Sequence, residues 1–352
     1  MSQKEIFHKK FNHYKELLIK YKELLQFVRH EPKMSQKELF EYELEKANES
    51  GEKLSHISNE LSIDELNDLD RMYGVANNLS LKNADFYRFF LKLLAIVGVI
   101  LTLSFLLYDE WDLYWLMISC FFAIGFLWVI RKWANNSRSH KNYLEFRVLA
   151  ESFRVQFFLS IAHINEKSVA EMLPWFIKKG PVWISEVLKE LPIFSLNGDP
   201  KPILNFWIRN QLSYNEYAYK KKKKENDKHK MITRTAIIIT VVVYAFAFFF
   251  EVYVLICSPT YFDLTWWRVN IKVILGVAAT LTLFAESYYG KMALEDIIED
   301  HSRMVELYKY AEQKVIHEGE SSEVILDLAQ EFLIENSTWY AYQNQNKPDL
   351  VL

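Results

Sequence analysis

Residues 237–257 read IIITVVVYAFAFFFEVYVLIC, and this stretch decides how the chain folds. It carries a single charged side chain and is as long as the roughly 20 residues that cross the hydrocarbon core of a bilayer. Three other apolar stretches follow the same pattern, at 89–108, 113–130 and 269–285. Together they form two hairpins, so the sequence predicts a membrane protein with four transmembrane helices.

The mean hydropathy of −0.07 hides these spans because three charged segments dilute them. The expected organisation, in chain order, is a cytosolic helical segment at 1–85, a first transmembrane hairpin at 86–133, a cytosolic helical region at 134–234, a second transmembrane hairpin at 235–287 and cytosolic C-terminal helices at 288–352.

The distribution of charge predicts the orientation. The turn at 109–112 holds three acids and no base, whereas Lys92 and Arg131 flank the other ends of the first hairpin. Basic residues in short flanks mark the cytoplasmic side. We therefore expect an inner-membrane, multi-pass protein whose two termini lie in the cytosol. The first eighty residues contain no apolar run, which predicts that there is no cleavable signal.

A block of five lysines precedes the second hairpin: Lys220, Lys221, Lys222, Lys223 and Lys224. One interpretation is a solvated helix face that enforces orientation. The other is a site for anionic lipid head groups, at about 1 kcal/mol per basic residue near the surface. Nucleic acid is not expected as a partner, since no aromatic side chains for base stacking alternate with these lysines.

The hydrophilic segments predict an all-α fold. Glycine and proline are scarce, and no segment alternates polar and apolar residues as a half-buried strand would. Residues 140–163 predict a helix with an apolar face and a charged stripe. From about Ile203, a second helix is expected to run without a break into the third span, with Trp207, Gln211, Tyr214 and Ala218 on one face. Ser35, Ser62 and Ser168 each begin a capping-box pattern or a helix start.

Motifs of enzymes are missing from the sequence. It has no phosphate-binding glycine loop, His-Glu-x-x-His, paired Cys-x-x-Cys or Gly-x-Ser-x-Gly. Cys120 and Cys257 both fall in predicted spans, where we expect small buried side chains. We therefore predict no catalytic residue, no cofactor and no metal, and do not expect an enzyme.

Three ionisable residues lie at membrane depth: Glu251, Lys272 and Glu286. Such residues are costly and usually pair or face water. One interpretation is that Lys272 extends outward and Glu251 neutralises it. The alternative places both in an outer pore vestibule, with Glu286 at the inner mouth. Small residues in the spans, Gly98, Gly125 and Gly276, predict close helix packing.

Four elements occur in an order that resembles the SLATT-type membrane effectors of prokaryotic conflict systems, in their four-span variety. They are AESFRVQFF at 150–158, Ser-Val-Ala at 168–170, Trp-x3-Gln-x2-Tyr at 207–214 and the closing stretch at 325–339. The chain departs from the pattern at Asn210, where relatives often have an acid, and at 342–344. Longer relatives also carry an N-terminal nucleotide-sensing domain, whereas helices are expected here.

The resemblance implies a homo-oligomeric antiviral effector that breaches the inner membrane when triggered, with the lipid bilayer and a separate cytosolic sensor protein as partners. By analogy and by their helical spacing, five residues are predicted to form a polar lock: Arg147, Glu151, Arg154, Gln156 and Gln211. A purely structural ion-pair stripe explains the first three equally well. The alternative function is a non-conducting membrane anchor or sensor that recruits a cytosolic partner through 1–85. A transporter is disfavoured, because there are few spans and no broken helix pair.

Overall fold

The computed structural model describes residues 34–50, 66–192, 200, 202–257, 263–291 and 294–345. Within these ranges the fold is all-α and contains no strand, as predicted. The elements, in chain order, are α2 (Gln36–Ser50), α3 (Asn67–Glu110), α4 (Leu116–Ser137), α5 (Ser139–Ile161), α6 (Val169–Met172), α7 (Trp175–Lys179), α8 (Val182–Lys189), the π-helical turn η2 (Leu204–Arg209), α9 (Asn210–Cys257), α10 (Leu264–Lys291), α11 (Leu294–Glu318) and α12 (Ser322–Gln345).

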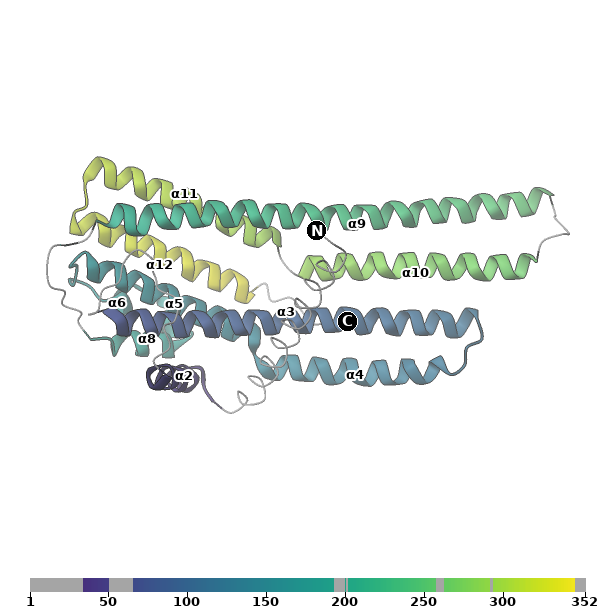
Figure 1. The fold of residues 1–352 in the computed structure, drawn as a ribbon, viewed down its shortest axis with the longest axis horizontal. Helices are drawn as coiled ribbons and strands as arrows, with labels where there is room; N and C mark the ends of the chain where they lie inside the picture. Colours follow the sequence, from purple (N-terminus) through teal and green to yellow (C-terminus); the bar gives the residue numbers. More distant parts are fainter. Residues whose placement is uncertain are drawn as a thin grey trace, which may run out of the picture. The chain divides into compact units, whose positions relative to one another are not determined.

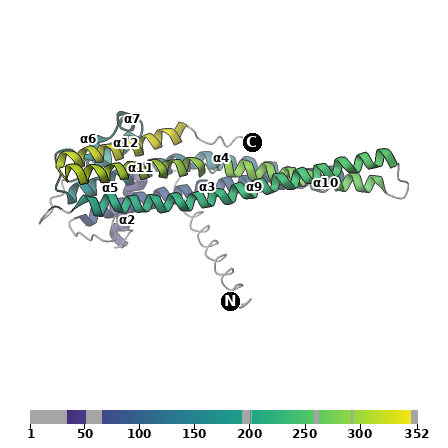
Figure 2. The ribbon, with the colours of Figure 1, turned by 90° about the horizontal axis from the view of Figure 1, so that it is seen from above.

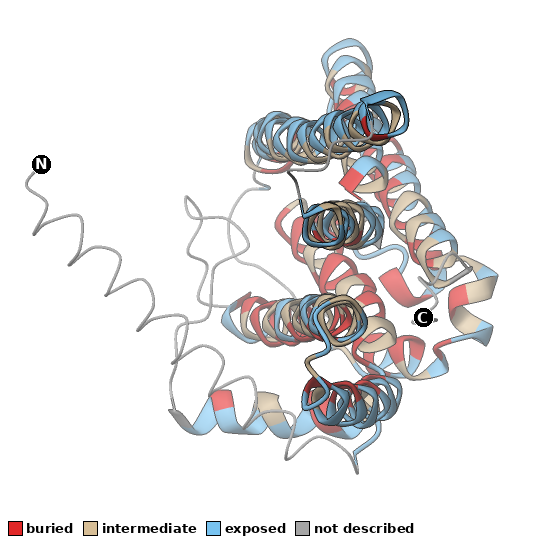
Figure 3. Ribbon diagram, turned by 90° about the vertical axis from the view of Figure 1, so that its right-hand side faces the viewer, coloured by how far each residue is buried: buried red, intermediate tan, exposed pale blue. Residues whose placement is uncertain are grey.

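Four helices, α3, α4, α9 and α10, are long and apolar enough to cross a membrane. The predicted uninterrupted helix is confirmed, because η2 passes directly into α9, which continues to Cys257 (Figures 1 and 2). Most residues are exposed along α4 and along α9 from Ile237 to Cys257, whereas the residues of α3 and α10 are mostly intermediate or buried (Figure 3). An apolar surface left uncovered in this way is suited to lipid.

The chain folds into two compact units. The head unit comprises the described residues of Met1–Tyr87, Asn135–Asn210 and Tyr310–Lys347, and the hairpin unit those of Arg88–Ala134 and Gln211–Lys309. Two of the five expected segments are thereby divided. The region 134–234 splits between Asn210 and Gln211, and the C-terminal segment between Lys309 and Tyr310.

Helix α5 is the centre of the head unit, and α12 packs along it. The expected apolar face is buried, with Phe146 and Phe153 fully covered. The helix is not half-solvated, however, since Glu151 on the predicted charged stripe is also buried. Aromatic rings join the elements, for example Phe40 of α2 stacked on Phe153 with ring centroids 5.8 Å apart.

Two of the three predicted helix starts lie in described residues. At Ser35 the capping box is confirmed, because Ser35 Oγ accepts the Glu38 N–H at 3.3 Å and the Glu38 carboxylate accepts the Ser35 N–H at 2.7 Å. Ser168 precedes α6, but its side chain makes no capping hydrogen bond. The third start, at Ser62, lies outside the described residues, as does most of the expected arm at 1–85.

Candidate functional site

The four apolar helices of the hairpin unit lie in a row, in the order α4, α3, α10, α9 (Figures 1 and 3). A hydrogen bond of 3.2 Å joins the hydroxyls of Ser104 on α3 and Ser119 on α4. Between the other two helices of the row, the hydroxyls of Thr240 on α9 and Thr282 on α10 lie 3.1 Å apart. A row of this kind leaves no central passage within one copy.

Two glycines bring α3 and α10 together in the middle of the row. A Cβ at Gly98 would lie 2.4 Å from Cε1 of Phe284, and one at Gly276 would lie 2.6 Å from Cδ2 of Leu106. Close packing was predicted for both positions and is confirmed. The same prediction is wrong for Gly125, where an added Cβ would meet nothing within 4 Å.

Charged residues lie near the C-terminal ends of α3 and α9 and near the N-terminal end of α10. They pair differently from the prediction. Glu251 of α9 accepts two hydrogen bonds from Arg268 of α10, at 2.9 and 2.7 Å, and not from Lys272. Lys272 instead lies 3.5 Å from the carboxylate of Glu110, the last residue of α3. The predicted Glu251–Lys272 pair is therefore wrong. Lys272 lies one helical turn beyond Arg268 on nearly the same, exposed face of α10, and the two long side chains reach to different neighbouring helices.

At the opposite ends of these helices, basic residues lie at one height along the helix axes, which we call the basic level. The contacts of Gly98 and Gly276 set the register in which Lys92 of α3 lies level with Gly290 of α10. Phe90 packs edge-on against Trp133, which brings Arg131 of α4 to the same level. Glu286, four residues before Gly290, is exposed about 6 Å from this level. It is thus near the expected end of the span.

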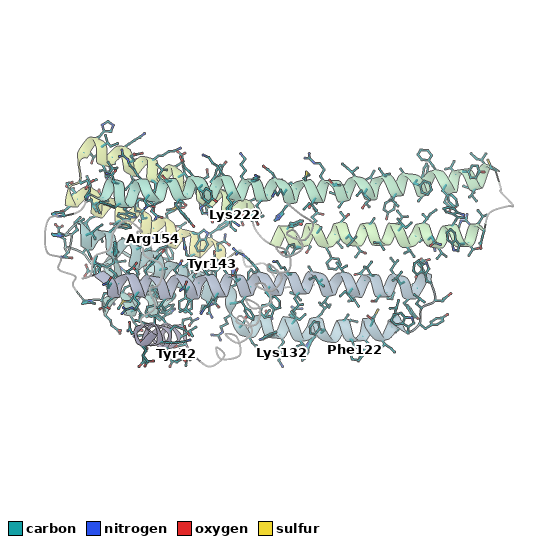
Figure 4. All side chains as sticks on the ribbon, viewed as in Figure 1. Tyr42, Phe122, Lys132, Tyr143, Arg154 and Lys222 are labelled. Atoms are coloured by element: carbon teal, nitrogen blue, oxygen red, sulfur yellow. The ribbon has the colours of Figure 1, made fainter. Side chains whose placement is uncertain are left out.

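The lysine block forms part of α9. Four of its members are exposed, and the fifth, Lys222 (Figure 4), pairs with Glu225 at 2.9 Å. The ammonium group of Lys223 lies over the ring of Tyr219, 5.7 Å from its centroid. This arrangement suits both interpretations of the block, a solvated face and a contact with lipid head groups.

Three of the five predicted lock residues come together in the head unit. The buried carboxylate of Glu151 lies 2.7 Å from a guanidinium nitrogen of Arg147 and 2.6 Å from one of Arg154. Arg154, labelled in Figure 4, also donates to the hydroxyl of Tyr73 and lies over its ring. Burial by itself would raise the pKa of Glu151, but the two guanidinium groups outweigh it and the pKa is lowered.

The two glutamines occupy other places. The side-chain oxygen of Gln156 accepts the N–H of Val169 at 3.4 Å, so that α5 caps the start of α6 where Ser168 does not. Gln211 is buried in the hairpin unit, and its backbone oxygen accepts from Asn215, whose Oδ1 lies 3.0 Å from Nδ1 of His301. The predicted helix face is wrong at Tyr214, which is exposed while Asn215 is buried.

The π-helical turn η2, which leads into α9, is anchored within the head unit. The indole of Trp207 in η2 is buried between Phe158, stacked at 5.0 Å, and Phe332 at 4.9 Å. The carboxylate of Glu320 accepts the backbone N–H groups of Ile203 and Leu204, at 2.9 and 3.0 Å. Such an acidic cap suits a helix start, where N–H groups lack partners and the dipole favours negative charge.

Binding groups for a small ligand are sparse in the described ranges. Among these residues no three His, Cys, Asp or Glu side chains gather as a metal site would require. An open hollow of about 420 Å³ is lined by Lys167, Glu171, Leu173, Gln330 and Ile334, among others. It carries no convergent set of catalytic groups.

Several functional candidates escaped the sequence reasoning. Arg268 and Glu110 were not predicted as site residues, although counting residues outward from the turn of the second hairpin places Arg268 level with Glu251. For Glu320 no local signal exists, because it caps a backbone more than a hundred residues away. No family model, curated protein or solved structure matches the chain.

Proposed function

We propose that the protein is a membrane effector of a prokaryotic antiphage defence system. It resides in the inner membrane with the head unit and both termini in the cytosol, assembles as a homo-oligomer, and permeabilises the membrane when a partner protein or nucleotide signal triggers it. The sequence resemblance supplies the defence context, and the physical arrangement of the helices supports a membrane role.

The observation that carries the proposal is the construction of α9. The turn that leads into it, η2, is held by the ring contacts of Trp207 and by the Glu320 cap, and α9 then continues into a strongly apolar stretch. A rigid helix transmits a displacement of its root along its length, whereas a loop absorbs it. A signal received by the head unit would therefore act on the second hairpin directly.

The positions of the charged residues along the helix axes support the placement in a membrane. The 18 residue-to-residue steps from Lys92 to Glu110 rise about 27 Å, close to the roughly 30 Å of a hydrocarbon core. Lys92 and Arg131 then lie at one boundary, and the pair of Glu110 and Lys272 at the other. The charged residues need not cross the bilayer centre, where their cost would be greatest.

Several copies are required for conduction, because one row of four helices encloses no passage. Repetition around an axis normal to the membrane would close such rows into a ring. The second candidate function is a non-conducting anchor that recruits a cytosolic partner. A single copy suffices for this role, because an anchor needs membrane-spanning helices but no passage between them.

Expression in bacterial cells loaded with a potential-sensitive dye tests the proposal. We expect induced protein to depolarise the membrane, and Glu251→Ala to change the extent because it leaves Arg268 without its partner. Phe122→Ala, on an exposed face of α4 (Figure 4), is the matched control and should behave as the parent.

The effector function is contradicted if the membrane potential stays intact at high expression, both with and without the genes that neighbour the gene of this protein. Co-purification of a stoichiometric cytosolic partner under the same conditions favours the anchor.

A further inference from the structure

The lysine block of α9 stands well above the basic level. The hydroxyl contact between Thr240 and Thr282 sets Ile232 of α9 level with Gly290 of α10, and thus at the basic level. The nearest lysine of the block lies eight residues before Ile232, and the farthest lies twelve residues before it. At 1.5 Å per residue, the block is about 12–18 Å above the basic level.

Lipid head groups do not reach this height in the membrane placement proposed above. They add about 5–8 Å to each side of the hydrocarbon core. In physiological salt, the field of a charged surface is screened over about 8 Å. The basic residues that meet lipid phosphates are therefore those at the basic level, such as Lys92 and Arg131, and the lysine block faces water.

An exposed stripe of side chains runs along the same part of α9. We call it the α9 stripe, and it consists of Tyr214, Tyr217, Lys221, Lys224, Lys228 and Met231, all of them exposed. Steps of three and four residues alternate along it, which keeps the six side chains on one face of the helix. Tyr217 is 66% exposed and Met231 64%. The opposite face of α9 is covered, because Gln211 and Asn215 are buried there and Asn215 contacts His301 of α11.

The positive charge of the block is largely uncompensated. Of its five lysines only Lys222 has an acidic partner, Glu225, and the other four form no ion pair with a described residue. Lys224 has a further lysine four residues before it, Lys220, and another four residues after it, Lys228. Like charges at this spacing oppose helix formation. An acidic partner alongside the helix would remove this repulsion.

We propose that the α9 stripe binds an acidic α-helix of a cytosolic partner protein. The proposal rests on the membrane placement of the proposed function and specifies the chemistry of the partner that triggers it. The three lysines supply charge complementarity, which favours an acidic partner and rejects a basic one. The tyrosine rings supply contact area of the kind that dominates protein interfaces. From Tyr214 to Met231 the stripe spans about 26 Å, nearly five turns of a helix lying beside α9.

The N-terminal segment of the chain does not suit the α9 stripe. Residues 1–33 carry eight Lys and Arg side chains but only four Asp and Glu. The lysines of the stripe repel a segment with such an excess of positive charge. For the same reason, the stripes of two copies do not pair with each other. The surface therefore favours an acidic helix from another protein.

A binding experiment tests the α9 stripe with the full chain in nanodiscs of neutral phosphatidylcholine. The probe is a fluorescent helical peptide of about 20 residues, with Glu opposite the lysines and Leu opposite Tyr214, Tyr217 and Met231. A peptide of the same composition in scrambled order is its control. By fluorescence anisotropy in physiological salt, we expect the scrambled peptide to bind at least tenfold more weakly than the patterned one.

Two pairs of substitutions with the same change of charge separate the stripe from the rest of the block. Lys221→Gln combined with Lys224→Gln removes two stripe residues and should weaken binding of the patterned peptide at least tenfold. Lys220→Gln combined with Lys223→Gln, to the side of the stripe, should weaken it less than threefold. Tyr217→Ala should weaken it at least fivefold, because contact area is lost without any change of charge.

A competing measurement tests the lipid alternative directly. An amine-reactive reagent is applied to nanodiscs with neutral lipid and to nanodiscs with phosphatidylglycerol, and the modified lysines are identified by mass spectrometry. We expect phosphatidylglycerol to protect Lys92 but to leave Lys221 and Lys224 as reactive as before. Protection of Lys221 and Lys224 assigns the stripe to lipid head groups and overturns the proposal.

Three further outcomes overturn it. The first is that the patterned peptide shows no measurable binding. In the second, both peptides bind equally or both lysine pairs cause the same loss, which means unspecific attraction of charge. In the third, a single-stranded oligonucleotide of equal charge binds more tightly than the patterned peptide and loses affinity with the stripe substitutions, which assigns the stripe to nucleic acid.

Peptide binding is measured without a defence readout, so the two proposals fail separately. A protein that prefers the patterned peptide but leaves the membrane potential of cells intact supports the α9 stripe and contradicts the effector function. A protein that depolarises cells but does not distinguish the two peptides supports the effector function and contradicts the stripe.

Discussion

A single buried carboxylate, that of Glu151, organises the charged cluster of the head unit. It compensates two guanidinium groups, and Arg154 in turn contacts Tyr73 of α3. Removing one member of a buried ion pair leaves an uncompensated charge, which costs about 3–5 kcal/mol when both groups are fully buried. Arg147 keeps 31% of its side chain exposed, so solvent reduces the cost here.

We expect Glu151→Gln to lower the free energy of unfolding by about 2–3 kcal/mol, since it retains the shape of the side chain and removes its charge. Thermal unfolding in detergent, followed by circular dichroism, measures the change. Glu190→Gln is the control, because the Glu190 bridge to Lys37 is exposed and exposed bridges contribute little to stability. Equal effects of the two substitutions would contradict a central role for Glu151.

Acid should weaken the same cluster. The pKa of Glu151 in the folded protein is below its ordinary value of 4.5, so the unfolded chain takes up the proton first as the pH falls. The stability from this carboxylate is complete above the ordinary value and is lost on acidification through the folded pKa. Unfolding curves from pH 7 to pH 3 should fall for the parent and flatten for Glu151→Gln; parallel curves would assign the acid sensitivity to other groups.

At the scale of elements, the packing of α3 on α10 depends on two positions without a side chain. Phe284 and Leu106 occupy the space that a Cβ would need at Gly98 and Gly276. The two contacts fix the register of the two helices, and this register sets Glu110 level with Lys272. A change at either glycine would therefore affect features several turns away.

Gly98→Leu should destabilise the hairpin unit by about 1–3 kcal/mol, because the leucine overlaps Phe284 and forces the helices apart. Gly125→Leu provides the matched control, as an apolar helix with the same substitution but nothing within 4 Å of the new Cβ. The temperature at which the protein aggregates in detergent reports the difference. Equal losses of stability in the two variants would contradict the packing role of Gly98, because leucine is by itself the better helix former.

For the whole molecule, the orientation in the membrane follows from the basic residues, which lie at one end of the membrane-spanning helices. With Cys257→Ser as background, a cysteine at the exposed Asp109 should react with a membrane-impermeant maleimide in intact spheroplasts. A cysteine at the exposed Lys223 should react only after the membrane is permeabilised. Labelling of Lys223→Cys in intact spheroplasts would invert the topology and place the head unit outside the cell.

Apolar length and periodicity determined much of this protein at the level of sequence. They were sufficient for the four candidate spans, the all-α class and the helix that continues from η2 to Cys257, because these features depend on neighbouring residues along one helix. The spacing of the charged stripe also brought Arg147, Glu151 and Arg154 together, since residues three and four apart share a helix face.

The tertiary structure alone decided which partners meet across helices. Glu110 takes Lys272 because Gly98 and Gly276 set the height of α3, whereas the common level of Glu251 and Arg268 follows from counting residues along their own hairpin. Glu320 caps a helix start that lies 117 residues away. Such contacts depend on the rotation and height of one helix against another, and no local pattern in a sequence contains either quantity.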